Sequence, residues 1–145
     1  MDLPVKAQAR FRVRYSETDQ MGIAYHGHYL VWFEMARTEL CALRGVRYRE
    51  IEEQDNLLLT VVEARCRYHA PARYDDEVIS EAKLALAHPR MIGFSYEVRN
   101  AATGQLLASG ETRHVFISRS GKPVKVPRKY FALFGIEAAS ESTLN

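Results

Sequence analysis

One polar stretch near the N-terminus holds most of the residues that could do chemistry. It runs from Ser16 to Tyr29 and combines a carboxylate, Asp19, with two histidines, His26 and His28. Its glycines allow the backbone to approach a ligand closely. A helix is predicted to begin where the stretch ends, so free N–H groups and the positive end of a helix dipole are expected there. A carboxylate facing such donors could attack an acyl group and stabilise the charge that develops on its oxygen.

The same residues allow three other interpretations. Asp19 could serve only to order a turn through its side chain. Asp19, His26 and His28 together have the ligand types of a metal site built from two histidines and one carboxylate. The pocket could also bind an acyl group without turnover. The residues and their spacing leave these alternatives open.

The helix that must position this stretch is predicted over residues 29–44. Its apolar residues cover more than half of the circumference, which predicts a helix mostly enclosed by protein rather than one on a surface. Gly45 follows as a stop signal. Glu34 and Arg37 have the spacing of a helical ion pair, so Glu34 is expected to be structural.

Alternating apolar and polar residues predict a sheet around this helix. In the segment 62–70 the even-numbered residues are apolar and are expected to face the interior. Short turns separate the runs, and the pair Asp75 and Asp76 is expected to order one of them. Four consecutive strands joined by short turns predict an antiparallel meander. The predicted strands are 11–15, 62–70, 78–86, 92–98 and 106–117.

Length and composition favour one globular domain spanning residues 1–145, with a core over about 8–134 and a frayed tail over 137–145. The net charge of +2 does not favour nucleic acid as a partner. No apolar run is long enough to span a membrane, and no signal peptide is evident. The two cysteines, Cys41 and Cys66, fit a reducing compartment, so a cytoplasmic location is expected. The sequence contains no phosphate-binding glycine loop and no G-x-S-x-G motif of a serine hydrolase.

Several spaced motifs resemble the signature of the hotdog-fold acyl-CoA thioesterases, in particular the 4-hydroxybenzoyl-CoA thioesterase family and its bacterial YbgC-like relatives. The resemblance covers about residues 8–130 and rests on several elements in the family's order. These are Tyr15-x-x-Thr18-Asp19-x-x-Gly22-x-x-Tyr25-His26-x-x-Tyr29, Phe33-Glu34-x-Ala36-Arg37, Pro71-Ala72-x-x-Tyr74-Asp75-Asp76 and Gly110-x-Thr112-x-His114-Val115.

The resemblance implies a fold, an activity and a set of catalytic residues. The fold is the α+β hotdog, an antiparallel sheet of about five strands wrapped around one long central helix. Asp19 falls on the family's catalytic carboxylate, which acts either as a nucleophile or as a base that activates water. The backbone N–H of His26 falls on the oxyanion donor, with Gly27 alongside, and Tyr25 and the His26 side chain shape the pocket or hold a water.

The resemblance also implies partners. The substrate is an acyl-CoA, and no metal or organic cofactor is expected apart from coenzyme A itself. Arg90, Arg128 and Lys129 are candidates to bind the CoA phosphates, because residues 119–129 carry five basic and no acidic side chains. A homodimer is implied, with a homotetramer left open, and the active site is expected at the dimer interface. Two rival functions stay open: an acyl carrier protein thioesterase and a non-catalytic acyl-CoA-binding hotdog protein.

Overall fold

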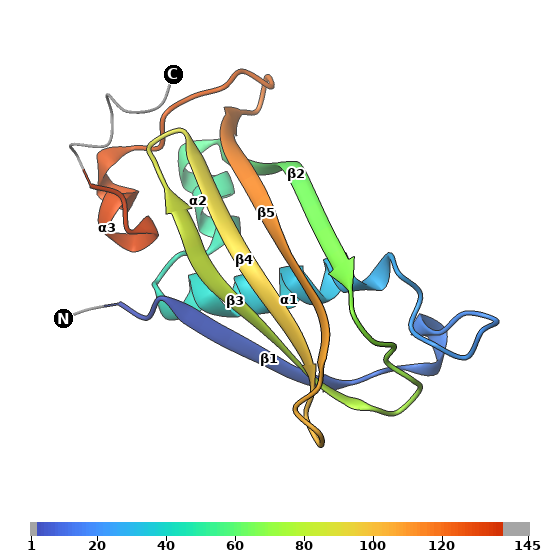
Figure 1. Cartoon of the computed structure of the whole chain (residues 1–145). Coiled ribbons are helices and arrows are strands. Elements are labelled where there is room, and N and C mark those ends of the chain that lie inside the picture. The colour runs from blue at the N-terminus through green and yellow to red at the C-terminus, as the bar shows by residue number, and fades with distance from the viewer. Residues whose placement is uncertain (1–2, 138–145) are drawn as a thin grey trace.

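Residues 3–137 form an α+β fold in the computed structural model, in which a helix of 16 residues packs against one face of a five-stranded antiparallel sheet (Figure 1). The α+β class and the five antiparallel strands are therefore confirmed. The predicted tail beyond residue 137 lies outside the described residues. No helix within the described range is both long and apolar enough to cross a membrane. The elements are β1 (Lys6–Arg12), α1 (His28–Leu43), α2 (Tyr48–Asp55), β2 (Leu57–Tyr68), β3 (Glu77–Ala87), β4 (Met91–Asn100), β5 (Leu106–Ser118) and α3 (Phe131–Phe134), with single 3₁₀ turns at Tyr15–Glu17 and Arg128–Tyr130.

The strand order is β1-β3-β4-β5-β2, so the predicted meander is correct only for β3, β4 and β5. β2 pairs with β5 instead of β3 and forms one edge of the sheet. The segment between β2 and β3 is not a tight turn, because the carbonyl of Ala72 accepts the N–H of Ala24 at 2.8 Å and Arg73 forms a bridge with Ile23. The chain thus crosses the end of the sheet beneath the polar stretch, and β1 pairs with β3.

α1 packs on the half of the sheet made by β1 and β3. Trp32 and Phe33 are fully buried, and the Phe33 ring stacks on Tyr96 with centroids 4.3 Å apart. Position 110 requires a glycine, because an added Cβ would collide with the backbone carbonyl oxygen of Arg65 on β2 and would also lie 2.7 Å from the Phe33 ring. Because Gly110 has no side chain, both the neighbouring strand and the helix can approach the sheet closely at this point.

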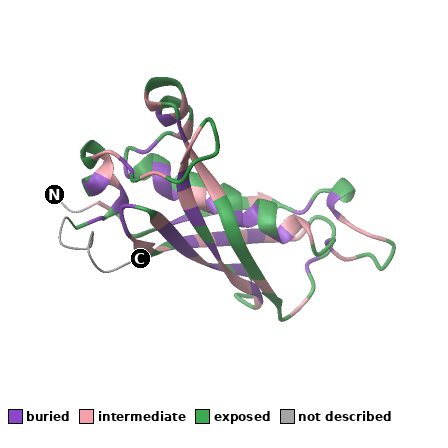
Figure 2. Ribbon diagram, turned by 90° about the horizontal axis from the view of Figure 1, so that it is seen from above, coloured by how far each residue is buried: buried purple, intermediate pink, exposed green. Residues whose placement is uncertain are grey.

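The prediction that α1 would be mostly enclosed is wrong for its other side. Leu30 and Val31 are 42% and 46% exposed, and Figure 2 shows buried and exposed residues along the same helix. The expectation of a single helix was also incomplete, because α2 follows α1. Ile51 is the only residue buried in α2, so this helix has too few apolar positions to give a clear period.

β2 is open to solvent over most of its length, although its even-numbered side chains were predicted to be interior. A bulge between Val61 and Glu63 shifts the register, and Val61 is 48% exposed. Val61 lines a shallow cavity of about 180 Å³ together with Leu30 and Val31 of α1. The edge strand and the helix therefore present one continuous apolar surface, which we call the β2–α1 patch (Leu30, Val31, Val61).

A buried chain of hydrogen bonds lies between α1 and the sheet. Arg37 donates from Nη1 to the Tyr96 hydroxyl at 3.2 Å, and Tyr96 and Thr112 share a short hydrogen bond. The Thr112 hydroxyl lies 2.8 Å from Nε2 of His114, which is 2% exposed. Arg37 thus hydrogen-bonds across the core to Tyr96. Burial would lower the pKa of its guanidinium, but the charge of Glu34 on its own helix still stabilises the guanidinium and helps to raise the pKa. If each hydroxyl donates onward from Arg37, Nε2 of His114 is an acceptor and its ring is neutral.

Burial, reinforced by the charge of Arg37, lowers the pKa of His114 to about 4. The unfolded chain binds this proton at pH values below about 6.5, whereas the folded chain does not until pH 4. We expect acidification from pH 6.5 to 4 to lower the free energy of unfolding by about 3 kcal/mol through this group alone. Urea unfolding of wild type and His114→Gln over this range measures the effect. The variant should show a shallower pH slope, and equal slopes would contradict the assignment.

Candidate active site

Asp19 lies at the start of a tight loop held by backbone hydrogen bonds. Its N–H donates to the carbonyl of Ile23 at 2.9 Å, and its carbonyl accepts the N–H of Gly22 at 3.0 Å. Gly22 has a φ of +78°, which an L side chain rarely adopts. One carboxylate oxygen of Asp19, Oδ1, accepts the N–H of Met21 at 2.9 Å. Asp19 thus orders a turn, as one interpretation predicted, and its second oxygen is not used in that turn.

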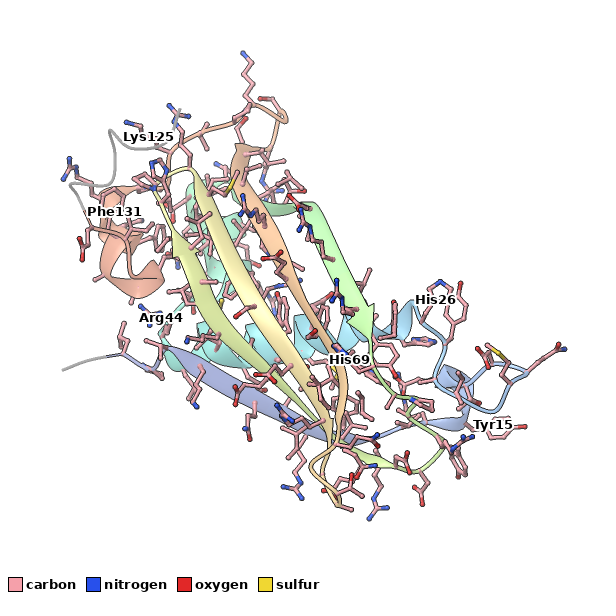
Figure 3. The ribbon with its side chains drawn as sticks, in the orientation of Figure 1. Tyr15, His26, Arg44, His69, Lys125 and Phe131 are labelled. Carbon is pink, nitrogen blue, oxygen red and sulfur yellow. The ribbon has the colours of Figure 1, made fainter. Side chains whose placement is uncertain are left out.

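The same carboxylate lines a largely apolar cavity of about 360 Å³. The cavity lies between the loop, the first turn of α1 and the residues that follow β2. His26 and Tyr29 contribute from the helix side, and Tyr68 and His69 from the end of β2. His69 was not expected from the sequence, because alternation within a strand does not show what the end of that strand approaches. Figure 3 shows His26 and His69 at the end of the molecule opposite Lys125 and Phe131.

The larger cavity of about 590 Å³, on the outer face of the sheet, is a weaker candidate. It is lined mainly by exposed, oppositely charged side chains such as Arg67, Lys83 and Glu97. It contains neither Asp19 nor a helix terminus. A reaction needs a positioned attacking group and stabilisation of developing charge, and the smaller cavity supplies both.

Two N–H groups at the start of α1 lie next to that smaller cavity, one on His26, which lines it, and one on the adjacent Gly27. The helix begins at His28, whose N–H donates to the carbonyl of Tyr25 at 3.0 Å. Within residues 3–137, the N–H groups of His26 and Gly27 have no hydrogen-bond acceptor. The Tyr68 hydroxyl donates to the His26 carbonyl at 2.9 Å and so helps to fix the orientation of this peptide. These N–H groups are therefore available to an anion or to a polarised carbonyl oxygen.

Tyr25 covers the helix start, and the glycine at position 27 allows it to do so. A Cβ added at Gly27 would lie 2.9 Å from the Tyr25 ring, whose centroid is 4.4 Å from that of His26. The predicted residues Asp19, Tyr25, His26 and Gly27 therefore meet at one end of the sheet. No group of three His, Cys, Asp or Glu residues in the described chain is arranged to hold a metal ion.

The candidate CoA-binding residues lie elsewhere. Lys129 forms a 2.8 Å ion pair with Asp55, just before β2 begins. The Arg128 guanidinium lies 5.6 Å from the centre of the Phe131 ring. Arg90 lies in the turn between β3 and β4. This end of the sheet, marked by Lys125 and Phe131 in Figure 3, is opposite to the loop that contains Asp19, so one chain does not bring these residues to the Asp19 cavity.

Two other acidic candidates have structural environments. Asp76 accepts the N–H of Arg73 through Oδ2 at 2.9 Å, and Asp75 has a φ of +68° in the same turn. The prediction that this pair orders a turn is thus confirmed.

Comparison with known proteins identifies the family. The sequence profile described as the thioesterase-like superfamily matches residues 13–134, which include both the Asp19 loop and the whole sheet from β2 to β5. The chain belongs to this superfamily. The resemblance inferred from the spaced motifs is therefore confirmed, and the Asp19 cavity is the candidate active site of a thioesterase-like protein.

Relatives in the thioesterase-like superfamily match along most of the chain. The putative acyl-CoA thioesterase YneP of Bacillus subtilis is 32% identical over 126 residues, covering 86% of this chain and 89% of that protein. The acyl-CoA thioester hydrolase YbgC of Escherichia coli is 28% identical over 128 residues, covering 85% of this chain and 91% of that protein.

Solved structures extend the likeness to three dimensions. The DHNA-CoA thioesterase of Staphylococcus aureus is similar with a TM-score of 0.85 at 26% identity, covering 90% of this chain and 89% of that chain. The 4-hydroxybenzoyl-CoA thioesterase of a Pseudomonas strain has a TM-score of 0.81 at 19% identity, covering 90% and 99%, and shows a common fold.

The contact between Gly27 and Tyr25 gives a direct test of the geometry at the helix start. Gly27→Ala should push the Tyr25 ring away, because the new methyl group would overlap it. We expect ring-to-ring nuclear Overhauser effects between Tyr25 and His26 to disappear. The loss of stability should stay within about 1 kcal/mol, because the ring is half exposed and free to move. Tyr25→Phe is the control and should retain the ring contact. Persistence of the contact in Gly27→Ala would contradict this geometry.

Proposed function

We propose that the protein is an acyl-CoA thioesterase that hydrolyses an acyl-CoA to a free acid and CoA at the Asp19 cavity. The observation that carries the proposal is that Asp19 and His26 line one cavity at the start of α1, where the N–H groups of His26 and Gly27 have no acceptor within residues 3–137. The names of the relatives YneP and YbgC support an acyl-CoA as the substrate class. The comparison structure named as a DHNA-CoA thioesterase supports the same class.

The chemistry follows from this placement. The thioester carbonyl oxygen accepts hydrogen bonds from the N–H groups of His26 and Gly27, which stabilise its charge as it becomes tetrahedral. In one route Asp19 attacks the carbonyl carbon and the CoA thiolate leaves. Water then hydrolyses the mixed anhydride and regenerates the carboxylate. In the other route Asp19 takes a proton from the water that attacks. Neither route calls for a metal or an organic cofactor.

We further propose that the active unit is a homodimer joined through β2. Its edge is unpaired in the described chain, and the β2–α1 patch exposes apolar side chains beside it. Both are features of a surface that another strand covers. If two β2 strands pair antiparallel, the Tyr68 end of one lies beside the Leu57 end of the other, and the Asp19 cavity adjoins the Tyr68 end.

This pairing offers a role for the distant basic residues. Asp55 and Lys129 form an ion pair just ahead of Leu57. The partner's Arg90, the partner's Arg128 and the partner's Lys129 would thus approach the cavity from across the interface. Their charges would attract the CoA phosphates. An acyl carrier protein as substrate is the second candidate, because these cations could equally receive its phosphopantetheine.

Asp19→Asn tests the proposed role of Asp19. The asparagine oxygen can still accept the N–H of Met21, so the loop and the melting temperature should be preserved. We expect kcat for thiol release from a panel of acyl-CoAs to fall at least about 10²-fold, because both routes need the carboxylate. Asp75→Asn is a matched control, since it makes the same chemical change in an exposed turn. Retention of activity by folded Asp19→Asn would exclude Asp19 as the attacking group or base.

Mixing two variants that each lose activity at acyl-CoA concentrations well below KM tests the shared site. Arg90 is exposed, and its side chain forms no ion pair within residues 3–137, so Arg90→Glu should fold normally and raise KM for acyl-CoA. In a mixed dimer with Asp19→Asn, one site keeps Asp19 and also receives the partner's intact Arg90. We expect co-refolded mixtures to recover about one quarter of wild-type activity, because half of the dimers are mixed and each has one complete site. No recovery above the sum of the separate variants would show that the site does not combine Asp19 of one chain with Arg90 of another.

A further inference from the structure

Glu17 is a buried carboxylate that the proposed reaction does not use. It is 3% exposed and ends the 3₁₀ turn that precedes the Asp19 loop. Its Oε2 accepts the indole N–H of Trp32 at 2.9 Å. Its Oε1 accepts the backbone N–H of Arg14 at 2.8 Å and lies 3.3 Å from Nε of the same arginine. Each oxygen of the carboxylate thus has its own donor, one of them from α1.

The backbone of Glu17 holds the other end of the loop. Its carbonyl accepts the N–H of Tyr25 at 2.8 Å, and Thr18 forms an antiparallel bridge with Ala24. Asp19 follows Glu17 by two residues, and His26 follows Tyr25. Glu17 therefore connects the loop that carries Asp19 to Tyr25, which precedes His26, through its backbone, and to Trp32 of the helix through its side chain.

The helix side of this contact is itself fixed. Trp32 is fully buried, and its ring packs against those of Phe11 at 5.2 Å and Tyr29 at 4.6 Å. Its carbonyl accepts the hydroxyl of Ser80 on β3 at 2.9 Å. Glu17 therefore connects the loop to a side chain that cannot move without disturbing the core.

A neutral side chain would not make the same contacts. Burial alone would raise the pKa of Glu17, but hydrogen bonds from the Arg14 N–H and the Trp32 indole, together with the Arg14 guanidinium, lower it overall. The group is thus an anion whose oxygens all face donors. Glutamine has one acceptor oxygen, and its NH₂ group would face one of these N–H donors instead of accepting from it.

We propose that Glu17 is a positioning residue, which fixes the distance between Asp19 and the N–H groups at the start of α1 by bonding Trp32. This inference rests on the proposed thioesterase function. Displacement of a reacting group by about 1 Å can cost about 10²-fold in rate. Loss of the contact should therefore act on kcat, whereas the pocket surfaces that determine KM stay in place.

Glu17→Gln is the test, with Ser80→Ala as the matched control. Ser80→Ala also removes one buried hydrogen bond to Trp32, but one to its backbone carbonyl and not to the indole that bonds Glu17. We expect Glu17→Gln to lower kcat about 10- to 100-fold with KM within about threefold, and Ser80→Ala to leave kcat within about twofold. Trp32→Phe removes the same contact from the other side and should reproduce the loss in kcat. The double variant should be no worse than Glu17→Gln, because both changes break one interaction.

A second measurement does not depend on activity. Hydrogen exchange of the peptide that contains residues 18–28 should accelerate in Glu17→Gln and not in Ser80→Ala. Trp32 is the only tryptophan, so its fluorescence reports whether the indole has changed surroundings. If wild type hydrolyses no thioester, the proposed function fails, and faster exchange would still support the positioning role. Unchanged exchange in Glu17→Gln, or a kcat equal to that of Ser80→Ala, would overturn it.

Discussion

The packing of α1 against the inner face of the sheet determines where the other parts of the candidate site can lie. Phe33 stacks on Tyr96 over the gap left by Gly110, and this contact fixes the depth of the helix on the sheet. Trp32, one residue earlier, then places its indole where Glu17 can accept from it. The loop, the helix start and the end of β2 converge because one aromatic pair on the helix has only one well-packed position.

The same packing leaves the opposite side of the helix uncovered. α1 lies over β1 and β3, so Leu30 and Val31 face the open edge at β2 instead of the core. A fold of this size would gain stability by covering such a surface within one chain. It is left open beside β2, the edge through which the proposed dimer forms. In the proposed dimer, the position of α1 over β1 and β3 has two consequences: it leaves the β2 side of the helix exposed, and the partner that covers this side also contributes residues to the site.

The positions of helices and strands along the chain could be predicted from sequence, whereas the strand that each strand pairs with and the distant residue that each side chain contacts could not. The helix was expected over residues 29–44 and spans 28–43, and Asp19 and His26 line one cavity at its start. Alternation, however, shows which side chains share a face and not which strand lies alongside, so the place of β2 beside β5 was missed. For the same reason the helical spacing of Glu34 and Arg37 did not show that Arg37 also hydrogen-bonds to Tyr96, 59 residues away in the chain.

The hydrogen bond from Met21 makes the two oxygens of Asp19 unequal. Oδ1 is held by the backbone of the turn, which restrains the carboxylate from rotating about its own axis. In the proposed reaction, Oδ2 is the oxygen that the turn does not engage, so it is the one available to an acyl carbon or a water. The loop therefore makes the two otherwise equivalent carboxylate oxygens of Asp19 different: Oδ1 bonds the turn, and Oδ2 does not. In the proposed reaction, an oxygen atom that the carboxylate gained from water would enter at Oδ2, and the hydrogen bond to Met21 would distinguish it from Oδ1.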